Sequence, residues 1–300
     1  MAVVLITGGS GLIGRALTKA LLARGDQVRW LSREAGLRGV VRAYAWDVER
    51  GMVDLEALRG VDHIVHLAGA GIADKRWSKR RVAELIASRA DSARLLLRGA
   101  REAGCRPQCI VSASGVGYYG AVTRDLPFTE DDAPGADTIA RITVEWERAV
   151  DEWASLCRVV KLRTPVVLAR EGGALPKLAA LARWGLAARI GSGKQWMPWV
   201  HVEDLVTAYL RALDDDTMQG AYNVVGGNST NLEFTKVLAS ALKRPMWLPP
   251  VPGALMRLAL GEVADLLLKG SPIESIRMSD SNLPRKSQLG FSLRTLMQES

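Results

Sequence analysis

The sequence lacks the long apolar run that a membrane-spanning helix requires. No stretch of its 300 residues approaches the roughly 20 consecutive apolar residues that cross a bilayer. Residues 1–7 carry no basic segment and soon give way to glycines, so they are typical of a first strand rather than of a signal peptide. The chain also contains no internal repeat and no low-complexity segment. These absences predict a soluble, cytoplasmic protein without a membrane partner.

Cysteine is scarce, and its arrangement excludes two common structural roles. The chain has three cysteines, Cys105, Cys109 and Cys157. An odd number without a secretion signal is not typical of a disulfide framework. The three-residue gap between Cys105 and Cys109 lacks the paired spacing of a zinc site. We therefore expect buried or unreactive thiols and no metal.

The charge distribution argues against a nucleic-acid partner. The formal net charge is +8, but arginine and lysine are spread along the chain beside acidic residues. Neither a basic block nor basic residues interleaved with aromatics occur. A ligand that carries phosphate accounts for a mild basic excess equally well. The partner we expect is a small molecule, and the assembly a monomer or a homodimer.

Apolar runs of strand length alternate with helical patterns in the first half of the chain. This alternation is typical of a mostly parallel sheet covered by helices on both faces. The expected strands are 2–7, 27–32, 41–46, 62–67, 107–112 and 158–164, and the expected helices between them are 12–24, 79–103 and 137–157. After Pro165, Gly-rich and Trp-rich loops precede helix-like stretches at 174–184, 203–213, 232–242 and 254–268.

These patterns predict an α/β fold: a Rossmann-type, doubly wound parallel sheet with a smaller, mainly helical C-terminal lobe. We expect residues 1–165, with a return segment at 199–228, to form a dinucleotide-binding domain. Residues 166–198 and 229–300 are then expected to form the lobe that receives the substrate.

A glycine motif follows the first expected strand and opens the first expected helix. Gly8 would allow a tight turn, Gly11 would let the backbone approach a pyrophosphate, and Gly14 would let the helix lie close to the sheet. The helix N-terminus would offer free N–H groups and a positive dipole to the phosphates. The cofactor-binding residues predicted here are Gly8, Ser10, Gly11, Leu12, Ile13 and Gly14.

The end of the second strand favours NADP(H) over NAD(H). An NAD enzyme usually carries Asp or Glu there to hold the ribose 2′-hydroxyl, and such a carboxylate would repel a 2′-phosphate. This chain carries Ser32 and Arg33 instead, and a guanidinium grips a phosphate through two charge-assisted hydrogen bonds. The alternative is that Arg33 is a solvated loop arginine and that the neighbouring Glu34 serves a ribose hydroxyl.

Several segments together resemble extended short-chain dehydrogenases/reductases, which include nucleotide-sugar epimerases. They are the glycine motif, residues 46–48, 66–69 and 112–120. Residues 71–77, 191–204 and 220–225 further resemble an atypical, epimerase-like subgroup that includes sugar-nucleotide-epimerase and cell-division-inhibitor-like proteins. The resemblance implies that Asp47, with Val48 beside it, faces the adenine. It also implies that Leu67, Ala68 and Gly69 lie along the cofactor.

The catalytic pair of that family is absent. Extended dehydrogenases carry Tyr-x-x-x-Lys on the helix after the fifth strand, where Ile139 and Thr143 stand here, and neither side chain can exchange a proton with a substrate. Ser114 fills the position of the catalytic Ser/Thr, or it merely caps a turn. Tyr118 and Tyr119 follow in a loop that could direct a phenol at the nicotinamide, although tyrosines there also serve packing. We therefore predict Ser114, Tyr118 and Tyr119 as the catalytic candidates.

Residues 74–77 combine two cations with a tryptophan beside the fourth strand, where an open α/β sheet binds ligands. They would suit an anionic substrate group, or they are the solvated, capped start of the next helix. His201 has only Glu203 and Asp204 nearby in sequence and is expected to be structural. The function that these residues predict is NADP-dependent reduction of a carbonyl, or epimerisation of a sugar-like substrate. The alternative is an NADP(H) sensor without catalysis.

Overall fold

A computed structural model describes residues 1–278 and 289–298, and its centre is a large sheet. Within the described residues the sheet has nine strands. Along it, β11 (Gly220–Asn223), β8 (Arg158–Thr164), β7 (Cys109–Gly115), β6 (His63–His66), β1 (Val3–Thr7), β2 (Gln27–Ser32), β4 (Val41–Asp47) and β3 (Gly36–Arg38) lie side by side, and β5 (Met52–Val53) pairs with β4. From β11 to β4 all neighbours are parallel, while β3 and β5 run antiparallel to β4. The predicted parallel sheet is confirmed.

The strand order places a ligand crevice between β1 and β6. The chain builds β2 and β4 outward on one side of β1, then crosses back to β6 and builds β7, β8 and β11 on the other side. In such doubly wound sheets ligands bind beyond the carboxyl ends of the strands at this reversal point. Thr7 and His66 are the last residues of β1 and β6. The glycine motif therefore opens directly into the crevice.

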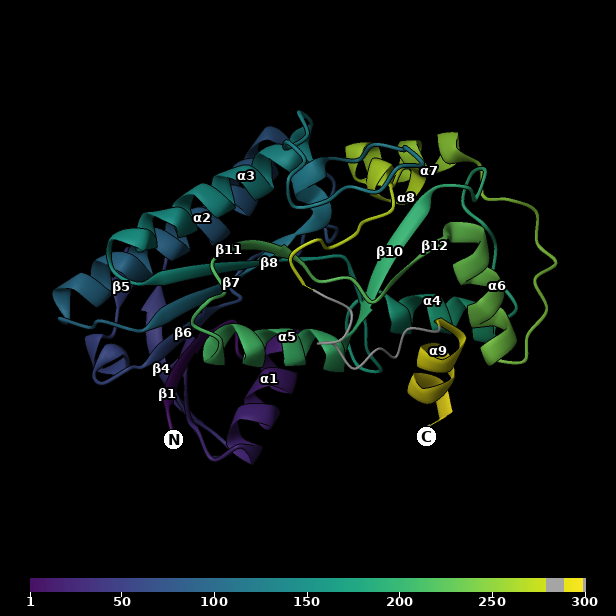
Figure 1. Cartoon of the computed structure of the whole chain (residues 1–300). Helices are drawn as coiled ribbons and strands as arrows, with labels where there is room; N and C mark the ends of the chain where they lie inside the picture. Colours follow the sequence, from purple (N-terminus) through teal and green to yellow (C-terminus); the bar gives the residue numbers. More distant parts are fainter. Residues whose placement is uncertain (279–288, 299–300) are drawn as a thin grey trace.

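Helices cover both faces of the large sheet (Figure 1). One face carries α1 (Leu12–Ala23) and α5 (Val202–Asp214), and the other carries α2 (Lys79–Glu102) and α3 (Thr138–Asp151). Helices α2 and α3 begin at polar caps: Ser78 accepts a hydrogen bond from Arg81 N, and Asp137 accepts one from Ala140 N. Short 3₁₀ turns lie at Leu55–Leu58, Val116–Tyr119, Glu152–Ser155 and Gly261–Ala264. Buried aliphatic side chains fill the space between helices and sheet on each face.

The smaller lobe contains a sheet as well as helices. Strands β9 (Val166–Leu168), β10 (Trp196–His201) and β12 (Gly227–Thr230) form it, with β10 between its two partners. Helices α4 (Leu175–Arg183), α6 (Asn231–Ala241) and α9 (Leu289–Gln298) share a core with this sheet that contains Trp199 and Phe234. The expected return segment 199–228 thus contributes β11 to the large sheet and parts of β10 and β12 to the small one. Residues 279–288 and 299–300 of the expected substrate lobe lie outside the described residues.

The prediction of a single helix at 254–268 is wrong. The structure has α7 (Gly253–Leu260) and α8 (Asp265–Leu268), separated by a 3₁₀ turn. Gly261 adopts a φ of +63°, a left-handed conformation that ends the α-helical path. The two short helices lie at the top of the view in Figure 1, above β10.

No helix among residues 1–278 and 289–298 is both long and apolar enough to cross a membrane. In the same part of the chain, no three His, Cys, Asp or Glu side chains gather in a way that could hold a metal ion.

Candidate functional site

The glycine motif forms a compact turn between β1 and α1. Gly8 has a φ of +69°, and a side chain there would approach the Leu67 carbonyl to 2.9 Å. A side chain on Gly14 would collide with the backbone of Gly8 and Gly9. Gly11 is the N-cap of α1 and is exposed, so its outward face is open to a ligand. The positions predicted for turning, for approach and for helix packing therefore have the geometry that those roles need.

The start of α1 is left open for an anion. Gly11 has no side chain to cap the helix, and no acidic residue lies in the first turn. The first helical N–H groups, at Leu12 and Ile13, therefore lack a capping side chain, and the positive end of the helix dipole is not neutralised locally. Ser10 is exposed beside them. Because a pyrophosphate satisfies such N–H groups, these residues fit a dinucleotide.

A hydroxyl joins the two strands at the crevice. Thr7 Oγ1 accepts hydrogen bonds from the backbone N–H groups of Leu67 and Ala68, both at 3.1 Å. It also lies 2.9 Å from Nδ1 of His66. These contacts hold the chain after β6 against the glycine turn, so Leu67 and Ala68 border the crevice, and their position along a cofactor stays a prediction. Gly69 follows them and is exposed.

His66 is completely buried and uncharged at neutral pH. Burial lowers its pKa to about 4. We expect the folded state to resist protonation of this ring while the unfolded chain protonates near the ordinary pKa of about 6.5. The neutral ring therefore contributes to the free energy of unfolding above pH ~6.5. This contribution, at most about 3 kcal/mol, is lost as the pH falls from ~6.5 towards 4.

Urea unfolding of the wild type and of His66→Asn at several pH values tests this expectation. The free energy of unfolding of the wild type should fall more steeply between pH ~6.5 and ~4 than that of the variant. Parallel curves would show that His66 does not titrate with folding.

The residues expected at the adenine end lie at the ends of β2 and β4. Ser32 is half-buried, and Arg33 is exposed and forms no ion pair within the described part of the chain. Glu34 instead lies 3.7 Å from the guanidinium of Arg38. Asp47 accepts a hydrogen bond from Arg50 N at 3.0 Å, and Val48 beside it is half-buried. Arg33 is thus available to a phosphate.

A cavity of about 350 Å³ lies at the carboxyl ends of β7 and β8, on the same edge of the sheet as the glycine turn. Its volume is at the lower end of the range of about 300–1,000 Å³ that is usual for ligand pockets. Both lobes contribute walls: Ile72, Arg89, Gly115, Val116, Gly117, Tyr119, Ile139, Ile142, Thr143 and Trp146 come from the large domain, and Val166, Trp196, Met197, Leu266, Lys269 and Ser271 come from beyond it. The positions where the family carries Tyr and Lys therefore face this cavity as Ile139 and Thr143.

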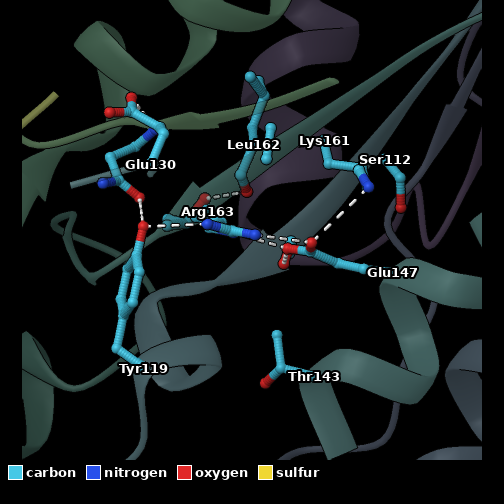
Figure 2. A network of polar contacts seen from close by, with 12 residues as sticks. Ser112, Tyr119, Glu130, Thr143, Glu147, Lys161, Leu162 and Arg163 are labelled. Atoms are coloured by element: carbon cyan, nitrogen blue, oxygen red, sulfur yellow. Dashed lines mark hydrogen bonds and ion pairs between the residues drawn. The ribbon is translucent and has the colours of Figure 1, made fainter. Parts of the chain in front are cut away.

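A buried polar network beside the cavity contains two of the predicted catalytic residues, Ser114 and Tyr119. Figure 2 shows Tyr119, Arg163 and Glu147 of this network. Ser114 Oγ donates to Glu147 Oε1 at 2.6 Å. Arg163 donates to both carboxylate oxygens of Glu147, at 2.8 and 2.9 Å, and to the hydroxyl of Tyr119 at 3.0 Å. Tyr119 in turn donates to Asn223 Oδ1 at 2.8 Å. Ser114 and Tyr119 are thus linked by a chain of hydrogen bonds through Glu147 and Arg163, and their hydroxyl protons point to protein acceptors rather than to a ligand.

The electrostatics of this network stabilise the charged pair and the neutral phenol. Burial raises the pKa of Tyr119, although the nearby Arg163 guanidinium opposes the shift. Burial alone would lower the pKa of Arg163, but the hydrogen-bonded Glu147 carboxylate raises it overall. Tyr118 lies with its ring 3.4 Å beneath the Arg163 guanidinium. The roles predicted for Ser114, Tyr118 and Tyr119 in catalysis stay predictions.

Every hydroxyl among the described residues that line the cavity donates to the protein. Tyr119 donates to Asn223, Thr143 to Ile139 O at 2.9 Å, Thr164 to Leu162 O at 3.1 Å and Ser271 to Val122 O at 2.6 Å. The charged residues of the described lining are two cations, Arg89 and Lys269, and none of the described lining residues is acidic.

Sequence reasoning did not predict a role for these two cations, or for Glu147 and Arg163. One signal was visible: Lys161 and Arg163 stand beside apolar residues in the buried part of strand β8. A charge within a buried parallel strand requires a partner, and both residues find Glu147, at 3.7 and 2.8 Å. Nothing in the local sequence distinguished Arg89 or Lys269 from the many exposed cations.

The segment at 74–77 combines features of both readings proposed for it. Lys75 and Arg76 are exposed, and Ser78 caps α2. The Trp77 indole donates to Ile72 O at 2.8 Å and so fixes the turn that places Ile72 at the cavity.

His201 caps α5, because its Nδ1 accepts from Glu203 N at 3.2 Å.

The comparisons with known proteins agree with this architecture. The family model described as the NAD dependent epimerase/dehydratase family matches residues 4–225. The epimerase family protein Mb2239 of Mycobacterium bovis is 40% identical over 266 residues, 88% of this chain and 86% of that protein.

Solved structures give the same assignment. The human epimerase family protein SDR39U1 (isoform 2), solved with NADPH, is similar with a TM-score of 0.84 and 30% identity, covering 99% of this chain and 100% of that one. MoeE5 in complex with UDP-glucose and NAD has a TM-score of 0.80 at 21% identity, covering 98% of this chain and 97% of that one, which supports the fold alone. The resemblance inferred from the motifs is confirmed, and the chain belongs to the NAD dependent epimerase/dehydratase family.

Proposed function

We propose that this protein is an NADPH-dependent reductase of small carbonyl compounds. The observation that carries the proposal is the largely apolar cavity between the two lobes, which lies at the same edge of the large sheet as the uncapped start of α1. A dinucleotide that extends from Arg33 past Gly11 would reach this cavity with its nicotinamide. The similar human protein was solved with NADPH, which supports the choice of the phosphorylated cofactor.

The bound cofactor would supply a hydride to the carbonyl carbon. The chain would supply an enclosed, largely apolar space and a proton for the carbonyl oxygen. A cavity hydroxyl has one proton, and each of these hydroxyls donates it to a protein acceptor, so we assign the proton to Lys269, which lines the cavity and keeps two N–H groups after donating one to Asp265 Oδ2 at 2.9 Å. A lysine can release a proton to an alkoxide, whereas an arginine retains it in proteins. Ser114, Tyr118 and Tyr119 are the alternative donors.

Consumption of NADPH in the presence of small aldehydes and ketones tests the proposal. We expect slow turnover with at least one carbonyl compound, with stoichiometric formation of the alcohol. The rival function is an NADPH sensor without catalysis, which the commitment of all four cavity hydroxyls to protein acceptors favours. A sensor would bind NADPH tightly and leave every carbonyl unchanged. A small-molecule partner, the absence of a nucleic-acid partner and a monomeric or dimeric state stay predictions.

The Arg33→Ala variant is expected to bind NADPH about 10- to 150-fold more weakly, because a charge-assisted hydrogen bond to a phosphate contributes about 1.5–3 kcal/mol. Affinity for NADH should stay nearly unchanged, since NADH lacks the 2′-phosphate. Calorimetric titration of both cofactors measures the ratio. Arg38→Ala, which removes an exposed arginine nearby, is the matched control. Equal affinities of the wild type for NADPH and NADH would contradict the assignment of Arg33.

A further inference from the structure

The charge balance of the cavity is one-sided. Most of its lining is apolar or aromatic, its two charged lining residues among those described are Arg89 and Lys269, and the described lining contains no Asp or Glu. Asp265, outside the lining, pairs with Lys269, so Arg89 is the cation of the described lining without an ion pair. A nucleotide sugar presents many hydroxyls that require acceptors as well as donors. Here the four hydroxyls of the described lining give their protons to the protein and can only accept from a ligand, so the two cations are its charged donors, and most of the remaining surface is apolar. The lining is more complementary to an apolar anion.

Arg89 is the more deeply buried of the two cations. Its exposed fraction is 9%, and it comes from the middle of α2. Its guanidinium donates to Leu85 O at 3.1 Å, Ala70 O at 2.8 Å and Ser88 Oγ at 3.4 Å. These three contacts engage at most three of its five N–H groups, and all three acceptors are neutral. Its carbon Cζ also lies 5.2 Å from the ring centre of Trp146, on the wall of the same cavity.

A buried guanidinium without a carboxylate is unusual. Among the described residues Arg89 forms no ion pair, whereas the buried Arg81, two turns earlier on α2, pairs with Glu84 at 2.6 Å. Burial lowers the pKa of Arg89 to about 10, and the neighbouring Arg81 adds to the shift. At neutral pH the group therefore stays charged. Removing a charge from water without an opposite charge is costly, so a ligand that supplies a negative group would gain from this site.

Building on the proposed reductase function, we propose that Arg89 binds the carboxylate of the substrate, and that the substrate class is apolar 2-oxo acids. The carboxylate of such a compound is adjacent to its ketone, so one molecule can contact the guanidinium and expose the carbonyl within the same small space. Its hydrocarbon part matches the wall formed by Ile139, Ile142 and Met197. Lys269 then lies on the part of the lining contributed from beyond the large domain.

Calorimetric binding to the NADPH complex tests the proposal without requiring turnover. Phenylpyruvate and phenylacetone share a ring and a ketone, and they differ in carrying a carboxylate or a methyl group. We expect the wild type to bind phenylpyruvate about 10- to 150-fold more tightly, the factor typical of a charge-assisted hydrogen bond. Arg89→Met should bring the ratio close to one, and Arg89→Lys should retain part of it. NADPH affinity, measured separately, should change little in both variants.

Arg81→Met is the matched control. Arg81 is also a buried arginine on α2 that holds the same loop, through Gly71 O at 2.6 Å, but it does not line the cavity. We expect this variant to keep the preference for phenylpyruvate. Equal binding of the two probes by the wild type, or a preference that survives in Arg89→Met, would overturn the proposal.

A loss of NADPH affinity equal to the loss of acid affinity in Arg89→Met would also overturn it, because the guanidinium would then serve the cofactor. Oxidation of NADPH is recorded in parallel. Selective binding of phenylpyruvate without any oxidation would retain the anion site and refute the reductase function instead. The two inferences therefore fail separately.

Discussion

Replacing Arg163 by methionine is expected to lower the free energy of unfolding by about 3–5 kcal/mol, because the substitution leaves a buried charge without its main partner. Glu147 is 5% exposed, and Arg163 supplies the two hydrogen bonds that engage both of its carboxylate oxygens. The remaining cation, Lys161, lies 3.7 Å from Glu147 and closer, at 2.6 Å, to Asp151. Tyr119 would lose a donor as well. Urea unfolding followed by circular dichroism measures the change.

Two further variants separate the buried charge from a general effect of losing an ion pair. Arg94→Met breaks a pair with Glu152 in which both side chains are 44% exposed, so it should cost at most about 1 kcal/mol. The double variant Glu147→Leu/Arg163→Met removes both buried charges and should recover much of the lost stability. If Arg163→Met proves no more destabilising than Arg94→Met, the network is not what holds Ser114 and Tyr119 in place.

The parts of the fold that the sequence predicts well are those with local causes. The strand expected at 27–32 is β2, and the helices expected from residues 12 and 79 begin at those positions. Apolar periodicity and capping residues specify such elements without reference to distant parts of the chain. The glycine motif belongs largely to the same class, because Gly8 turns the chain through its positive φ and Gly14 packs on Gly8 and Gly9 within the same turn. The turn that these glycines form was therefore predictable, whereas the binding of a cofactor by the residues around it stays a prediction.

The substrate end depends on contacts between distant residues. Tyr119 and Asn223 meet across 104 positions of sequence, and Ser114 and Glu147 across 33. The cavity is completed by residues from both lobes, and the small sheet that carries Trp196 and Met197 pairs strands from three separate segments. No local pattern specifies that Lys269 would line the same space as Arg89. Strands β3 and β5 were missed for a different reason: they are short and largely exposed, so they lack an apolar pattern.

The absence of the family's Tyr/Lys pair leads to the prediction with the largest effect on activity. Replacing Lys269 by methionine is expected to lower the rate of NADPH-dependent reduction of phenylpyruvate by about 10²–10⁴-fold, the usual contribution of a positioned proton donor. The reason is that Thr143, Thr164, Ser271 and Tyr119 each donate their single hydroxyl proton to a protein acceptor, whereas the Lys269 ammonium donates one of its three protons to Asp265 and keeps two. Single-turnover oxidation of bound NADPH measures the step without interference from product release.

Lys269→Arg distinguishes proton transfer from simple attraction of an anion. An arginine keeps the positive charge and so should preserve the affinity for phenylpyruvate, but it does not release its proton in proteins, and the reduction rate should fall nearly as far as in Lys269→Met. Full activity of Lys269→Arg would reduce the role of this residue to charge. If both variants stay active while Tyr119→Phe or Ser114→Ala does not, the donor is in the buried network after all, and the Glu147–Arg163 pair becomes the device that positions it.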